Sequence, residues 1–147
     1  MKKVIFLIVV CFFAFQVSAQ VTDTLSYLQT EVVAKKNLYI GQPLSKLLSD
    51  LQIQPKSIFG GIAHNNKTIE PYTKFYYGDH GAASSNAYYI TISWESTLQK
   101  SETMSLQMNN NGLLNTTVKN YYANKIIKDI TVSRNPDFTN RHRRAND

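Results

Sequence analysis

Asp79 and His80 are the neighbouring residues whose types come closest to an acid–base pair. A carboxylate can tune an imidazole for proton transfer, and the glycines on either side would let a substrate approach the backbone. However, adjacent side chains seldom point the same way, and no Gly-x-Ser-x-Gly motif supplies a nucleophile. We therefore interpret Asp79 and His80 as solvated turn residues. A hydrolase that uses His80 with a nearby carboxylate, such as Glu95, is the alternative.

Metal and cofactor sites have no recognisable pattern in this chain. Its three histidines, His64, His80 and His142, are far apart, and none belongs to a His-x-x-x-His or His-Glu-x-x-His pair. The single cysteine, Cys11, lies in the leader described below, so the mature chain offers no thiolate ligand. The sequence therefore predicts no metal and no cofactor, with a pair of His64 and His80 from two loops as the alternative.

Nucleotides and nucleic acids are also poor matches for this sequence. Gly60 and Gly61 are not followed by the Lys-Ser/Thr of a phosphate-binding loop, so we interpret them as a strand bulge. The formal net charge of +6 falls to +4 without the two lysines of the leader. So small and dispersed an excess argues against a nucleic-acid partner. The basic residues 141–144 near the C-terminus leave docking to an anionic polymer as a weaker alternative.

Tyrosine is the residue type that points to a binding surface. Tyr76, Tyr77 and Tyr89 lie on the central segments with strand character, where successive side chains point to opposite faces. Some of these rings must therefore lie on the outer face, where tyrosine supplies rigid contact area with a polar edge. We expect these three residues to bind a protein or carbohydrate partner. Packing within the sheet is the alternative.

The first nineteen residues have the pattern of a secretory signal peptide. Two lysines precede an apolar run of twelve residues, Val4 to Phe15, and residues 17–19 supply the small side chains of a cleavage site. A membrane-spanning helix needs about twenty apolar residues, so this run is too short. We expect cleavage between Ala19 and Gln20, a periplasmic or extracellular mature chain and no integral membrane segment.

Helical spacing of apolar residues recurs in three segments. The leucines and valines between 24 and 35 follow this spacing, although the pair Val32-Val33 leaves a strand as the alternative there. Pro43 suits the first turn of the second segment, because its missing N–H has no partner to lose there. The predicted helices cover residues 24–35, 43–51 and 115–127.

Period-two alternation marks the strands. In the clearest case Tyr88, Ile90, Ile92 and Trp94 share one face, which we assign to the core. The predicted strands cover residues 57–63, 72–77, 87–95 and 103–108, with a further short strand near 130–132 and a hairpin loop at 78–86.

The sequence therefore predicts one small α+β domain over residues 20–134, with an antiparallel sheet of about four strands packed with two or three helices. Residues 135–147 are polar and basic, and we expect a disordered tail. Because no catalytic signature accompanies the leader, the prediction is an exported, small, non-enzymatic binding or accessory protein of the bacterial envelope or secretome.

Overall fold

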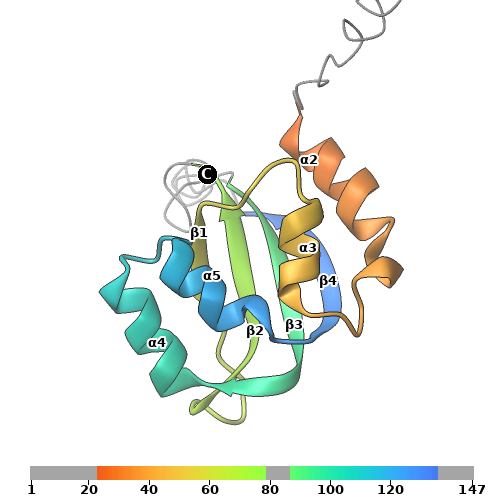
Figure 1. The fold of residues 1–147 in the computed structure, drawn as a ribbon. Helices are drawn as coiled ribbons and strands as arrows, with labels where there is room; N and C mark the ends of the chain where they lie inside the picture. The colour runs from red at the N-terminus through yellow and green to blue at the C-terminus, as the bar shows by residue number, and fades with distance from the viewer. Residues whose placement is uncertain (1–22, 79–86, 136–147) are drawn as a thin grey trace, which may run out of the picture.

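A four-stranded antiparallel sheet forms the centre of the molecule (Figure 1). The structure is a computed structural model that describes residues 23–78 and 87–135. The strands lie in the order of the sequence, β1-β2-β3-β4, so each pairs with the next one along the chain. Their bounds are Ser57–Gly60 for β1, Ile69–Tyr77 for β2, Tyr88–Gln99 for β3 and Ile127–Arg134 for β4. The predicted small α+β domain is confirmed.

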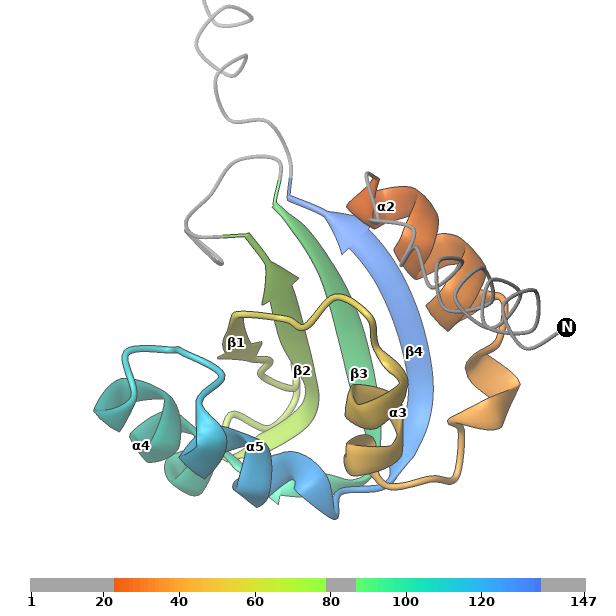
Figure 2. The same cartoon turned by 45° about the horizontal axis from the view of Figure 1, so that its top comes forward.

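Helices cover one face of this sheet. In both views α3, α4 and α5 lie on the same side of the strands, and α2 flanks β4 (Figures 1 and 2). None of the helices in the described part of the chain is long and apolar enough to cross a membrane. Their bounds are Thr24–Tyr27 for α2, which continues as a π-helical segment η1 over Leu28–Val33, Lys36–Leu38 for the 3₁₀ turn η2, Leu44–Asp50 for α3, Lys100–Asn109 for α4 and Thr116–Ala123 for α5.

The core lies between the sheet and these helices. Ile90, Ile92 and Trp94 of β3 are buried, as their alternation predicted, and Val118 of α5 and Leu44 of α3 pack into the same cluster. Fully burying a side chain of this size stabilises the fold by about 1.5–3 kcal/mol. The apolar stripe that predicts each helix is therefore also what holds it on the sheet.

One predicted strand is wrong, because residues 103–108 belong to helix α4. Met104 and Met108 fall on alternate positions, which resembled a strand face, but they are 52% and 68% exposed. Lysine, glutamate, methionine, leucine and glutamine fill most of the helix, and these residues have high helix propensity. Local propensity was therefore the better indicator here, since neither methionine belongs to the core.

Helix α5 ends four residues before its predicted end at residue 127. Asn115 begins it by accepting a 3.1 Å hydrogen bond from the backbone N–H of Val118. After Ala123 the chain leaves the helix, and the N–H of Ile127 donates to the carbonyl of Gln42 at 2.9 Å. Pairing with this distant segment redirects residues 124–127 away from the helix and into β4.

Strand β3 bends sharply where β2 loses register with it. Tyr72 pairs with Ser93 and Glu70 pairs with Leu98, so Pro71 alone stands opposite the four residues 94–97. Proline has no N–H to donate, which makes it a natural place for strand pairing to stop. The bend carries the end of β3 across the sheet toward α4 (Figure 1).

Candidate functional site

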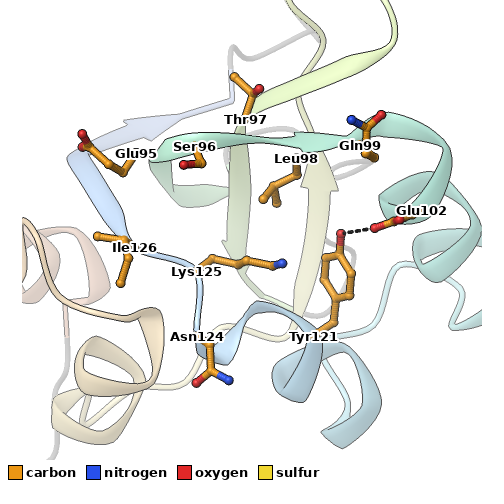
Figure 3. Close-up of a pocket in the computed structure, with 10 residues that line it drawn as sticks. All are labelled: Glu95, Ser96, Thr97, Leu98, Gln99, Glu102, Tyr121, Asn124, Lys125 and Ile126. Carbon is orange, nitrogen blue, oxygen red and sulfur yellow. Dashed lines mark hydrogen bonds between the residues drawn. The ribbon is translucent and has the colours of Figure 1, made fainter.

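A pocket of about 350 Å³ lies at the bend of β3. Its lining comes from residues 95–99 of β3, Glu102 in the first turn of α4, Tyr121 of α5 and residues 124–126 that follow α5 (Figure 3). This volume is at the lower end of the range for small-ligand sites, which is about 300–1,000 Å³. We call it the β3-bend pocket.

Tyr121 forms one wall of the pocket. Its hydroxyl donates a 3.2 Å hydrogen bond to Oε2 of Glu102, which joins α5 to the first turn of α4 (Figure 3). Nζ of Lys125 lies 4.8 Å from the centroid of the Tyr121 ring, a cation–π geometry. Burial, and then the neighbouring Glu102 carboxylate, raise the pKa of Tyr121 to about 12. The hydroxyl therefore remains a hydrogen-bond donor at physiological pH.

The pocket carries two carboxylates, those of Glu95 and Glu102. Within residues 23–78 and 87–135, neither Glu95 nor Glu102 belongs to an ion pair. Lys125, the one cation of the lining, is placed over the Tyr121 ring. In Figure 3, Glu95 and Glu102 stand toward opposite ends of the pocket, with Leu98 between them. The pocket is therefore acidic in a chain whose net charge is positive.

The backbone of β3 is also open at this pocket. The N–H of Glu95 donates to the carbonyl of Ile126 at 3.0 Å. Beyond this bond, the segment that connects α5 to β4 diverges from β3. Ser96 and Thr97 then have no strand partner in the register with β2 or with β4. Unpaired strand backbone next to a pocket offers donors and acceptors to a ligand.

A buried network beneath the pocket fixes the two helices that form its walls. Glu70 is fully buried, and its carboxylate accepts hydrogen bonds from Thr73, from Thr103 at 2.7 Å and from Tyr122 at 3.2 Å. Lys100 forms an ion pair with the same carboxylate at 3.2 Å. Because Lys100 and Thr103 are in α4 and Tyr122 is in α5, the carboxylate ties both helices to β2.

Gly60 provides the space for this network. A Cβ atom at position 60 would lie 1.9 Å from Oε2 of Glu70, so a larger residue would displace the carboxylate. The Gly60 carbonyl accepts a 2.9 Å hydrogen bond from Nζ of Lys100. The register irregularity lies between Glu70 and Tyr72 of β2, whereas Gly60 pairs regularly with Thr73. Position 60 therefore needs glycine for close approach rather than for a bulge.

The three tyrosines expected to bind a partner do not share one surface. Tyr76 and Tyr89 are neighbours on the outer face of β2 and β3, with ring centroids 4.9 Å apart, and Nζ of Lys74 lies 4.5 Å from the Tyr89 centroid. Tyr76 is only 3% exposed, and Tyr77 packs into the core at 6%. Binding by these residues stays a prediction, and of the three only Tyr89 has a partly exposed side chain.

The candidate acid–base pair, Asp79 and His80, lies outside the described residues, as do the leader and residues 136–147. His64 is exposed in the loop between β1 and β2. Among the residues that the structure describes, no group of three His, Cys, Asp or Glu side chains could hold a metal ion.

The sequence did not predict the β3-bend pocket. Pro71, within an otherwise strand-like segment, is the signal that could have suggested interrupted pairing.

Comparison of the chain with protein-family models, with curated proteins and with solved structures finds no match.

Proposed function

We propose that this chain is an exported, non-enzymatic binding or accessory protein of the bacterial envelope or secretome, and that its partner occupies the β3-bend pocket. The leader pattern over residues 1–19 supports export, with cleavage between Ala19 and Gln20. The mature chain would then work in the periplasm or outside the cell.

The observation that carries the proposal is the combination of a pocket with carboxylates and strand backbone that pair with nothing of their kind in the described residues. Ser96 and Thr97 lack strand partners, and the carboxylates of Glu95 and Glu102 lack ion-pair partners within the described residues. A ligand in the pocket could satisfy both the backbone and the charges. Tyr121 supplies an aromatic wall of the kind that anchors many interfaces.

Site-specific photocrosslinking in the cells that make the protein tests this proposal. A benzophenone amino acid replaces Thr97, an exposed residue of the pocket, in the full chain with its leader. The control carries it at Met104, which is 52% exposed on α4 and outside the pocket lining. We expect one discrete adduct from position 97 and none from position 104. No adduct at 97, or equal adducts at both positions, would contradict the proposal.

A further inference from the structure

The geometry points to a specific chemistry for the occupant of the β3-bend pocket. We propose that it is an extended peptide segment of a partner protein, with two basic residues four positions apart and an apolar residue midway between them. The inference rests on the proposed function and names the partner class for the same site.

The open backbone favours a peptide. β3 pairs with β4 up to Trp94, and the N–H of Glu95 then donates to the carbonyl of Ile126, in the segment between α5 and β4. Backbone groups of an antiparallel strand point to the same edge at every second residue, so Thr97 continues the edge that Glu95 used. No strand partner occupies Thr97 within the described chain. An extended peptide that adds to this edge gains main-chain hydrogen bonds, as in β-augmentation.

The charges select the side chains of that peptide. Glu95 and Glu102 stand toward opposite ends of the pocket, with the apolar side chain of Leu98 between them and Ile126 at the Glu95 end (Figure 3). In an extended peptide, residues i, i+2 and i+4 face the same way and span about 13 Å. The part of β3 that lines the pocket, Glu95 to Gln99, also has five residues, and Glu102 follows three residues later in the first turn of α4. A basic residue at each end and an apolar residue in the middle would match this order.

Lys125 shows that the Tyr121 wall accepts a cation. Its ammonium group lies 4.8 Å from the centroid of the Tyr121 ring, close to the Glu102 end of the pocket. A basic side chain of the peptide would compete for this position, and the charge of Lys125 would oppose it. Replacing Lys125 with glutamine should therefore tighten binding, because it removes the competitor and keeps both carboxylates.

The test uses the purified mature chain, labelled with ¹⁵N, and acetylated, amidated pentapeptides. The probe is Lys-Thr-Val-Thr-Lys, and its isomer Thr-Lys-Val-Lys-Thr keeps the composition but moves the charges. We expect the probe to shift the amide signals of Ser96 and Thr97. Because the isomer turns both lysines to the opposite face of the extended peptide, the probe should bind about tenfold more tightly, a difference of about 1.4 kcal/mol. Lys125→Gln should tighten the probe about threefold.

The matched variant is the double substitution Glu95→Gln with Glu102→Gln. It should abolish the preference for the probe over its isomer, because both carboxylates are gone. Any one of three results would overturn the inference. The two peptides could bind the unchanged protein equally, the amide shifts could be confined to Tyr89 and the outer face, or millimolar probe could cause no shift. A discrete photo-adduct at position 97 together with any of these results would leave the proposed function standing and refute only the peptide chemistry.

Discussion

The Tyr121 hydroxyl donates a 3.2 Å hydrogen bond to the Glu102 carboxylate and thereby connects the end of α5 to the beginning of α4. Glu102 is in the first turn of α4, where a negative charge also interacts favourably with the helix dipole. The hydrogen bond holds two walls of the β3-bend pocket together. The Glu102 carboxylate still has no ion-pair partner among the described side chains, so it remains available to a ligand.

Alkaline pH should destabilise the fold through its tyrosines. Tyr76 and Tyr121 have pKa values raised to about 12 by burial, whereas a tyrosine in the unfolded chain has its ordinary pKa of 10.0. Above pH 10 the unfolded chain loses protons that the native chain retains, so the free energy of unfolding falls as pH rises toward 12. Urea unfolding followed across this range measures the fall. In Tyr121→Phe the free energy of unfolding should fall less steeply with pH, and an unchanged slope would contradict the raised pKa of Tyr121.

Glu70→Gln should lower the free energy of unfolding by about 3 kcal/mol, because it leaves Lys100 without its carboxylate in a largely buried site. The control is Glu31→Gln, which breaks an ion pair with Lys35 whose side chains are about half exposed. The control should cost less than about 1 kcal/mol. Urea denaturation of both variants gives the comparison, and similar losses would mean that the buried network does not organise the pocket walls.

Gly60→Ala should be destabilising by about 1–3 kcal/mol, since the new Cβ would lie 1.9 Å from the Glu70 carboxylate and displace it. Gly41 offers a contrast, because its φ is +76° and a Cβ atom there would meet no other atom within 4 Å. Gly41→Asn should recover much of the stability that Gly41→Ala loses, as asparagine tolerates the left-handed region. Gly60→Asn should show no such recovery. If Gly60→Asn did recover stability relative to Gly60→Ala, glycine would be needed at position 60 for its backbone conformation and not for close approach to Glu70.

Removing the hydroxyl of Tyr77 and that of Tyr122 should change the stability of the protein in opposite directions. The Tyr77 hydroxyl is buried and has no hydrogen-bond partner in the described chain, so Tyr77→Phe should stabilise the protein by about 1 kcal/mol. The Tyr122 hydroxyl donates to Glu70 at 3.2 Å, so Tyr122→Phe should destabilise it by a similar amount. Thermal and urea unfolding of the pair provide the measurement. A loss of stability in Tyr77→Phe would show that its hydroxyl has a partner in the native protein.

Alternation and helical spacing predicted the elements that depend on local pattern. The buried face of Ile90, Ile92 and Trp94 followed from period two, and α3 followed from its leucines after Pro43. The strand predicted over residues 103–108 was wrong because the exposed methionines of a helix happened to fall on alternate positions. In that segment only the weaker signal of helix propensity pointed the right way.

The candidate site could not be predicted because it depends on pairings between distant residues. The register change that places Pro71 opposite residues 94–97 is a property of two strands together. The contact of Tyr121 with Glu102 requires α4 to be a helix, which the alternation of Met104 and Met108 obscured. Glu70 is likewise a single acidic residue in the sequence, and only the fold brings its donors around it.

The adduct yield from position 97, compared with position 104 in the same cells, tests the central claim most directly. Both positions are exposed, but only Thr97 lines the β3-bend pocket. The account predicts one discrete adduct from position 97, identified by mass spectrometry as the same partner in repeated experiments, and background yield from position 104. Background yield at both positions, in cells that export the protein, would contradict it.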